Sequence, residues 1–226
     1  MTRLTLIAAV FTFISLPAFA ADDDRVEPGF NEQTFKGLEM RSIGPAFMSG
    51  RIADIAIDPN DQSTWYVGVG SGGVWKTVNG GTTWEAIFEN EDAYSIGSIT
   101  IDPNNSNTIW VGTGENISGR HVGYGAGVYR SLDGGQNWEN MGLEDSEHIG
   151  MIRVDPRDSN IVFVAAQGPL WSAGGDRGLF KSADGGESWR KVLGDGHGNT
   201  ELDDRYTGVS EVHICLLYTS PSPRDP

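Results

Sequence analysis

A glycine-rich stretch near the middle of the sequence combines three side chains with complementary chemistry. Glu115, Arg120 and His121 offer an acid, a cation and an imidazole base. Such residues in a glycine-rich loop suit ligand binding or acid–base catalysis. We therefore expect a ligand-binding or catalytic role for this loop, with Glu115 as the candidate catalytic residue. The structural alternative is a loop held together by its own Glu115–Arg120 ion pair.

Further candidate ligand-binding residues lie outside this stretch. Arg51 follows a glycine at the start of a predicted strand and suits an anionic ligand, with an ion pair to a neighbouring carboxylate as the alternative. Trp171 and Tyr124 suit stacking on a sugar ring, with packing over an adjacent unit as the alternative. Asp176 and Arg177 add opposite charges to the predicted loop that contains Trp171.

Signatures of other chemistries are missing from the sequence. It contains no Ser-His-Asp signature, no phosphate-binding loop and no His/Cys spacing typical of a metal site. Asp203 and Asp204 carry the ligand type that calcium prefers, although a solvated acidic loop is the commoner use of such residues. The sequence therefore predicts neither a cofactor nor a bound metal.

Acidic residues dominate the charge of the chain. Thirty-one Asp and Glu residues against 16 Lys and Arg residues give a formal net charge of −15 at pH 7. Such a chain gains neither counterion release nor Coulomb attraction from nucleic acid or an anionic membrane. We expect a peptide, protein or carbohydrate ligand and no nucleic acid. The oligomeric state stays open.

The first 20 residues have the pattern of a secretory signal peptide. Arg3 precedes an apolar stretch at 4–16, and an AFA cleavage site follows at 18–20. The apolar stretch is short for a membrane span, and an uncleaved anchor is the alternative. We expect a secreted or periplasmic protein with no membrane insertion after cleavage, in which residues 21–50 lead into the folded domain.

The last twelve residues depart from the pattern of the preceding chain. Three predicted strands run into Asp-Pro turns at 58–59, 102–103 and 155–156, and a fourth copy of such a strand begins at 212–214. It continues with Cys215 and a proline-rich tail instead of Asp-Pro. The tail, 215–226, resembles a translated sequencing adapter, so we predict that it is not native and that Cys215 has no redox or catalytic role. A genuine Pro-rich tail is the alternative.

An eight-residue motif occurs three times. It reads TVNGGTTW at 77–84, SLDGGQNW at 131–138 and SADGGESW at 182–189, which places its tryptophans 54 and 51 residues apart. A hydroxyl residue and Asn or Asp cap a turn, two glycines supply positive φ, and the tryptophan begins a strand. A spacing near fifty residues indicates one repeated supersecondary unit. We expect structural roles and buried indoles for the motif residues, which are Asn79, Trp84, Asp133, Trp138, Asp184 and Trp189.

Each unit is predicted to contain four strands. The expected ranges are 53–58, 64–69, 73–77 and 83–88; then 98–102, 108–113, 127–131 and 137–140; then 151–155, 161–166, 178–182 and 188–193. The first strands alternate apolar and polar residues, whereas the second strands are nearly continuous apolar runs that suit burial on both faces.

Four antiparallel strands repeated at this spacing are typical of β-propeller blades. We predict an all-β fold in which residues 51–214 form about three blades and the first strand of a fourth; a long β-sandwich is the alternative. Because propellers close with roughly four to eight blades, we expect two blade faces to expose apolar residues.

Antiparallel strand order sorts the connections onto two edges. The Asp-Pro turns and the repeated motifs fall on one edge, and they vary little. The connections from second to third strands, and those between units, fall on the other edge and vary in length and chemistry. We expect function on this variable edge, since binding sites commonly occupy loops of a rigid scaffold.

The repeated motif resembles the Asp-box, or BNR repeat, of sialidases, xyloglucanase-type glycoside hydrolases and the sortilin N-terminal propeller. The first copy departs from it because Asn79 keeps the side-chain acceptor without the charge. The wider sequence is similar to bacterial secreted sortilin-like or "glycosyl hydrolase" BNR-repeat proteins over 35–214. The segments that carry this similarity are FKGLEMRSIGP (35–45), SGRI (49–52), GSGGVWKT (70–77) and GTGEN (112–116). The resemblance implies a propeller and little about activity, because Asp-boxes are structural in these families.

The enzyme sites that the resemblance implies are incomplete here. A xyloglucanase-type catalytic Asp would precede the Gly-Gly pair at 72–73, where this chain has Gly70. The Phe-Arg-Ile-Pro pattern of sialidases reads GRIA at 50–53, which keeps only Arg51 and Ile52. We therefore favour a secreted module that binds a peptide, protein or glycan through its variable loops. The alternatives are a glycoside hydrolase with further acids in additional blades and a structural repeat of a larger envelope protein.

Overall fold

A computed structural model describes residues 50–117, 119, 121–193 and 205–215. The chain divides into two units, Met1–Arg41 and Ser42–Pro226, and every described residue belongs to the second. The predicted signal peptide, Arg120, Asp203, Asp204 and the tail beyond Cys215 lie outside the described residues. The part of the chain that is described contains no helix long and apolar enough to cross a membrane.

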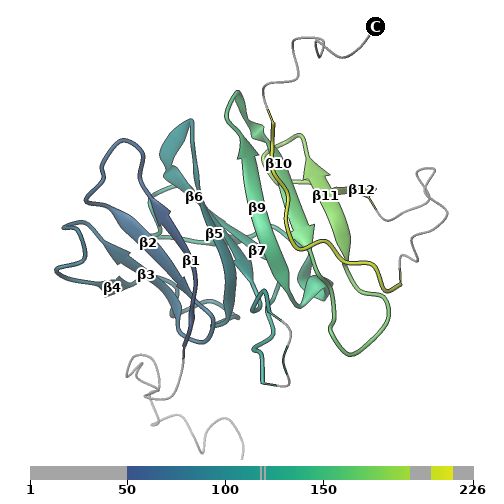
Figure 1. Ribbon diagram of the computed structural model, residues 1–226. Coiled ribbons are helices and arrows are strands. Elements are labelled where there is room, and N and C mark those ends of the chain that lie inside the picture. The colour runs from purple at the N-terminus through teal and green to yellow at the C-terminus, as the bar shows by residue number, and fades with distance from the viewer. Residues whose placement is uncertain (1–49, 118, 120, 194–204, 216–226) are drawn as a thin grey trace, which may run out of the picture. The chain divides into compact units, whose positions relative to one another are not determined.

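Three antiparallel sheets of four strands follow one another along the chain (Figure 1). The first contains β1 (Ile52–Ile57), β2 (Trp65–Val69), β3 (Gly73–Thr77) and β4 (Glu85–Ala86). The second contains β5 (Ile96–Asp102), β6 (Asn105–Thr113), β7 (Val128–Ser131) and β8 (Glu139–Asn140), and the third contains β9 (Ile149–Asp155), β10 (Asp158–Ala166), β11 (Gly178–Ser182) and β12 (Arg190–Leu193). The only described helix is a short 3-10 turn, η1 (Glu144–Ser146). The prediction of three four-stranded units is confirmed.

The fourth strand of each sheet is shorter than the sequence predicts. The expected ranges began at 83, 137 and 188, yet the strands begin at Glu85, Glu139 and Arg190. The backbone N–H groups of Thr83, Asn137 and Ser188 donate to the Asn79, Asp133 and Asp184 side chains of the repeated motifs. These residues complete the turn and so do not join the ladder.

The first strands of the three sheets lie next to one another (Figure 1). The Ile99 N–H donates to Asp54 Oδ2 at 3.0 Å, which joins β5 to β1. The Thr100 hydroxyl donates to the Ile152 carbonyl at 2.9 Å, which joins β5 to β9. This adjacency makes β1, β5 and β9 the inner strands of three successive blades.

Two apolar clusters fill the seams between the sheets. The first seam is filled by side chains such as Tyr66 of β2 and Phe88, which follows β4, and by Ile99 and Ile101 of β5. The second seam repeats the arrangement with residues of the second and third sheets. Burying such side chains against the neighbouring sheet supplies the main driving force for stacking the blades.

One face of β1, the inner strand of the first sheet, is uncovered among the described residues. Ile55 and Ile57 are exposed, whereas Ile99 and Ile101, at the same positions of the second unit, are buried. The alternation predicted for the first strands is therefore present in β1, and its apolar face lacks a described neighbour. This exposure agrees with the expectation that an incomplete ring of blades exposes apolar residues.

The motif tryptophans are less buried than the sequence predicted. Trp138 and Trp189 are partly buried, and each indole N–H donates at 2.7 Å to a carbonyl of the preceding sheet, that of Ile87 or Met141. Trp84 has no described preceding sheet and is 41% exposed. The Trp138 and Trp189 indoles thus close the seams to their preceding blades, and the fully buried tryptophan is instead Trp110.

The repeated motifs form three turns with the same side-chain capping, which we call the repeat hairpins (77–84, 131–138 and 182–189). The Ser131 hydroxyl donates to Asp133 and accepts the Gly135 N–H, and Ser182 and Asp184 repeat this geometry. Hydrogen bonds, chiefly from Asn137, lower the pKa of Asp133 to about 2. Those chiefly from Ser188 lower the pKa of Asp184 to about 2.

Residues 205–215 follow the path of a fourth inner strand without forming one. A Cβ on Gly97 would lie 2.2 Å from the Ile149 carbonyl oxygen, and a Cβ on Gly150 would lie 2.3 Å from that of Ser210. The inner strands β5 and β9 therefore approach the next segment at equivalent glycines. The expected strand at 212–214 is not assigned, because no second strand pairs with it in the described part of the chain.

Candidate functional site

The variable loops of the three sheets meet at one edge. Two long loops, the described part of 114–127 and 167–177, extend below the sheets in Figure 1, on the side opposite the turns that join β5 to β6 and β9 to β10. The connections 70–72 and 143–148 belong to the same edge because of the antiparallel strand order. We call these four segments the loop edge.

Glu115 is the charged centre of the loop edge. Its side chain is 5% exposed and forms an ion pair with Arg51, whose side chain is 45% exposed. The Ser71 hydroxyl donates to Glu115 Oε1 at 2.9 Å, and the Gly123 N–H donates to the same oxygen at 3.4 Å. The alternative interpretation of Arg51, an ion pair with a neighbouring carboxylate, is the arrangement in the structure.

Two glycines let the main chain approach this carboxylate closely. A Cβ on Gly70 would lie 3.2 Å from the Glu115 carboxyl carbon, and a Cβ on Gly123 would lie 2.8 Å from the Ser95 hydroxyl. Ser95 in turn donates to the carbonyls of Gly70 and Gly123 at 2.6 and 3.1 Å. The side-chain space beside Gly70, where the resemblance implied an aspartate, is thus occupied by Glu115.

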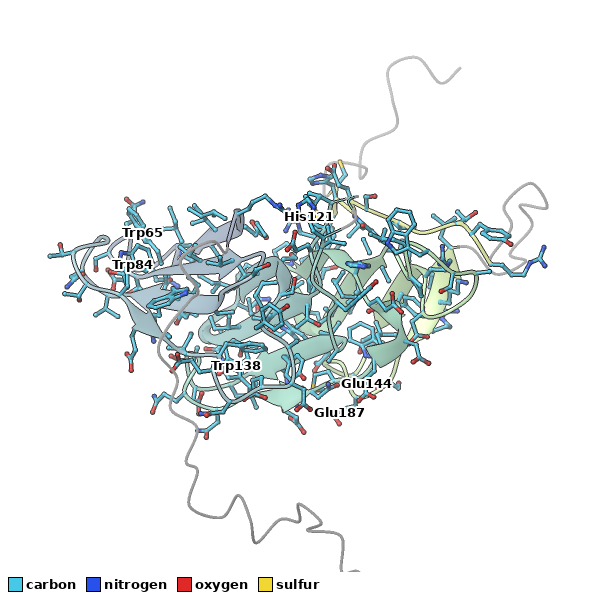
Figure 2. All side chains as sticks on the ribbon, turned by 90° about the horizontal axis from the view of Figure 1, so that it is seen from below. Trp65, Trp84, His121, Trp138, Glu144 and Glu187 are labelled. Carbon is cyan, nitrogen blue, oxygen red and sulfur yellow. The ribbon has the colours of Figure 1, made fainter. Side chains whose placement is uncertain are left out.

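Aromatic and basic side chains are exposed on the same loop edge. His121 is exposed at the loop edge (Figure 2), and its Nε2 lies 3.5 Å from Arg51 Nη1. Tyr124 and Trp171 are also exposed. The edge therefore presents a cation, an imidazole and flat apolar rings, which are groups that contact peptides and sugars.

Arg177 is placed differently from the other candidates. Its side chain is buried and donates to three carbonyls of its own loop, those of Gly174, Pro169 and Ser172, at 2.7, 2.7 and 2.8 Å. Because its N–H groups bind three carbonyls of one loop, the Arg177 guanidinium fixes the conformation of the loop that carries Trp171.

Asp176 lies against a second acidic residue. Its N–H donates to the Asp145 carbonyl at 3.1 Å. Burial raises the pKa of the Asp176 carboxyl, and the charge of Asp145 raises it further. Asp176 therefore joins the 167–177 loop to the segment that precedes β9.

Two residues of the loop edge were missed by sequence reasoning. Ser71 contacts Glu115 from a short connection that looked like an ordinary glycine-rich turn. His148 is fully buried and binds the Glu115 carbonyl through Nδ1 at 2.9 Å. The signal that pointed to His148 was its place in a variable connection, but its burial depends on loops far apart in the sequence.

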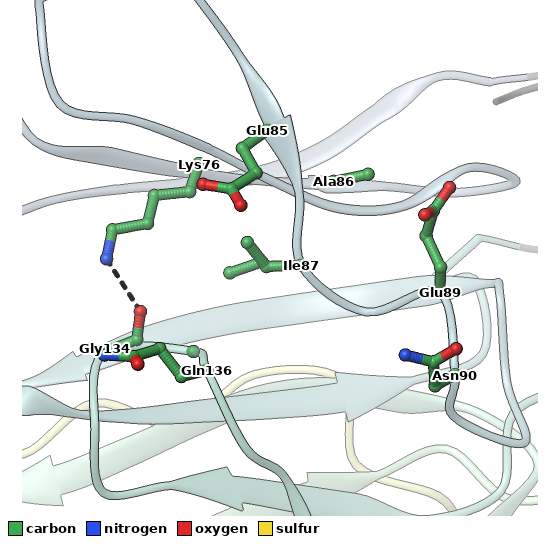
Figure 3. A pocket seen from close by; sticks show the side chains of 9 residues that line it. Lys76, Glu85, Ala86, Ile87, Glu89, Asn90, Gly134 and Gln136 are labelled. Carbon is green, nitrogen blue, oxygen red and sulfur yellow. Dashed lines mark hydrogen bonds between the residues drawn. The ribbon is translucent and has the colours of Figure 1, made fainter.

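A separate groove of about 290 Å³ lies between β4 and the second repeat hairpin (Figure 3). Glu85, Ile87 and Asn90 line one side, and Gly134 and Gln136 line the other. Lys76 Nζ donates across it to the Gly134 carbonyl at 2.8 Å. The groove is part of the seam between two blades and contains none of the predicted ligand-binding residues.

The described residues contain no cluster of three or more His, Cys, Asp or Glu side chains suited to a metal ion.

Neither a protein-family model nor a curated protein matches the chain. Solved structures match its fold, and one of them is an ancestral GH74 enzyme, with 22% identity and a TM-score of 0.51 over 67% of this chain and 20% of that chain.

Two further similar structures have lower scores. A GH74 xyloglucanase from Xanthomonas campestris shares 20% identity over 66% of this chain and 21% of its own, with a TM-score of 0.47. YCF48 bound to D1 peptide shares 16% identity over 65% of this chain and 41% of its own, with a TM-score of 0.44.

The fold comparison identifies a β-propeller fragment. The neighbours are β-propellers of low sequence identity, and three stacked four-stranded sheets agree with that fold. The chain spans about a fifth of the length of the GH74 enzymes it matches. Identity of this order establishes the fold and leaves function to the residues of the site.

Proposed function

We propose that this chain is part of a secreted Asp-box (BNR-repeat) β-propeller that binds a peptide, protein or glycan through its loop edge. The observation that carries the proposal is the setting of Glu115. A cation, a hydroxyl and a main-chain N–H all direct their hydrogens at its carboxylate. The carboxylate therefore acts as an acceptor that fixes Arg51 and the 114–127 loop beneath the exposed groups.

Fixed loops with exposed rings favour recognition. Trp171 is held at the surface by a loop whose carbonyls are bound by Arg177, so little conformational freedom is lost when a ligand packs on the indole. Nearly half of the Arg51 side chain remains accessible. Together these groups offer stacking and charge-assisted hydrogen bonds to one ligand.

A glycoside hydrolase is the alternative that the sequence left open. That chemistry requires a second carboxylate on the other side of the scissile bond, and the described partners of the Glu115 side chain are all donors. If the alternative holds, Glu115→Gln should abolish turnover of a glycan panel by the full-length protein. The binding proposal expects no turnover by either form.

We expect Trp171→Ala and Arg120→Ala to weaken retention of ligands selected from glycan and peptide arrays by about tenfold, equivalent to ~1.4 kcal/mol. The reason is loss of a stacking surface in the first variant, and of a cation that the sequence places between two described parts of 114–127 in the second. Array selection followed by titration of the selected ligand measures the effect, and thermal unfolding should change little.

Leu132→Ala is the matched control for Trp171→Ala. Leu132 is 61% exposed and Trp171 is 64% exposed, but Leu132 lies in the second repeat hairpin on the opposite edge. Equal retention by the Trp171 and Leu132 variants would show that the loop edge is not the binding surface.

A further inference from the structure

A buried histidine joins the loops on which the proposed site depends. His148 is fully buried, and its Nδ1 lies 2.9 Å from the Glu115 carbonyl oxygen. Because a carbonyl only accepts, Nδ1 must carry the proton in this contact. The imidazole therefore holds the main chain of the residue whose carboxylate binds Arg51.

The other ring nitrogen of His148 has no hydrogen-bond partner among the described residues. Adding a proton to Nε2 would place a cation and an unpaired donor in a buried site, which is costly. Burial accordingly lowers the pKa of His148, opposed in part by the negative charge of Glu147. The closed arrangement is compatible with the neutral ring only.

The backbone around His148 connects both long loops. The His148 carbonyl accepts the Gln167 N–H at 2.9 Å, and the Glu147 carbonyl accepts the Gly125 N–H at 2.8 Å. Glu147 has a φ of 57°, a conformation that few residues other than glycine adopt. Residues 147 and 148 therefore link 114–127 to 167–177 through a strained backbone, and protonation of the His148 ring would disturb this link.

The groups that face His148 leave a route for opening. From the 114–127 loop, Tyr124 lies over the ring at a centroid distance of 5.6 Å and is itself exposed, and the Glu115 carboxylate is bound to Arg51. From the 167–177 loop comes the neutral Gln167, and from its own segment comes Glu147. Because Tyr124 is exposed, it can move away from the imidazole without unstacking the blades.

We propose that His148 is a positioning residue that keeps the described parts of the 114–127 loop closed while its ring is neutral, so that mild acid opens the loop edge and releases ligand. The loop opening stands on the structure alone, whereas the release of ligand rests on the proposed function. For a group with a lowered pKa, the stabilisation is present above the unfolded-state value of about 6.5 and is lost as the pH falls toward the folded value.

Hydrogen exchange of the full chain tests the opening without any ligand. Between about pH 7.5 and about pH 5, after correction for the intrinsic exchange rate, the described amides of 114–127 should lose about tenfold in protection as the stabilisation by the neutral ring is lost. Amides of the second repeat hairpin should keep their protection from exchange at both pH values. Unchanged protection of the loop in the wild-type protein would overturn the proposal.

His148→Asn supplies the decisive comparison. The asparagine side chain would keep a donor near the Nδ1 position and cannot ionise, so protection of the loop should persist at the lower pH. The matched controls His121→Asn and His213→Asn remove exposed imidazoles and should leave the wild-type acid response intact. An acid response that survives in His148→Asn or disappears in His121→Asn would assign the effect to another group.

The proposed function is tested separately by titrating the array-selected ligand at both pH values. If the loop loses protection in acid but the protein binds no ligand at either pH, the binding role is wrong and the proposed loop opening is retained. Ligand release that is equal in wild type and His148→Asn would overturn the link between the two.

Discussion

Gly97→Ala is expected to lower the free energy of unfolding by about 3 kcal/mol or more. A Cβ at this position would lie 2.2 Å from the Ile149 carbonyl oxygen and 2.3 Å from that of Gly114. Both atoms belong to the backbone, so no flexible side chain can give way. Overpacking of this kind commonly costs about 1–3 kcal/mol and occasionally more, and here it separates β5 from β9.

Chemical denaturation of the two proteins measures this effect. Gly119→Ala is the matched control, because its Cβ would meet only the Val122 and His121 side chains, at 3.5 and 3.8 Å. We expect that control to stay within about 0.5 kcal/mol of the wild type. If Gly97→Ala unfolds at the same denaturant concentration as Gly119→Ala, the inner strands are not packed as described.

Arg51→Ala is expected to destabilise the loop edge by about 1–3 kcal/mol. The change leaves the Glu115 carboxylate, which is 5% exposed, without its cation. Breaking a fully buried ion pair costs about 3–5 kcal/mol. The expected loss here is smaller, because the Arg51 side chain is 45% exposed and water screens the pair. Thermal unfolding together with exchange of the 114–127 amides measures the loss.

A double-mutant cycle separates the ion pair from other effects of the change. Glu115→Gln removes the charge and keeps the shape, so Arg51→Ala in that background should cost much less than in the wild type. Equal costs in the two backgrounds would mean that Arg51 and Glu115 do not interact in solution.

The repeat made most of the fold predictable. The motifs at 77–84, 131–138 and 182–189 specify turns through local hydrogen bonds, so strand order followed from sequence alone. The third strands of the first and third sheets, Gly73–Thr77 and Gly178–Ser182, begin and end as expected. The fourth strands were overestimated because capping residues of the motif use the N–H groups that a ladder would need.

Burial was harder to predict than strand order. Identical motif tryptophans were expected to be equally buried, yet Trp84 is exposed while Trp138 and Trp189 contact a preceding sheet. An indole at a seam depends on the neighbouring blade, which a pattern within one unit does not describe.

The sequence predicted which edge carries the candidate residues better than it predicted the contacts between their side chains. Glu115 and His121 do lie on the loop edge, but the cation bound to Glu115 in the described structure is Arg51, from a different blade. Sequence spacing favours local pairs, whereas the blade arrangement brings the end of β6 to the start of β1. His148 was missed for the same reason, since its partners come from two other loops.

Footprinting of the bound ligand tests the central claim, that recognition takes place on the loop edge. Hydroxyl-radical oxidation of Trp171, Tyr124 and Trp84, all of them exposed, should be compared with and without the array-selected ligand. The account predicts that oxidation of Trp171 and Tyr124 falls while that of Trp84, on the hairpin edge, stays the same. Protection of Trp84 with Trp171 and Tyr124 unchanged would contradict it.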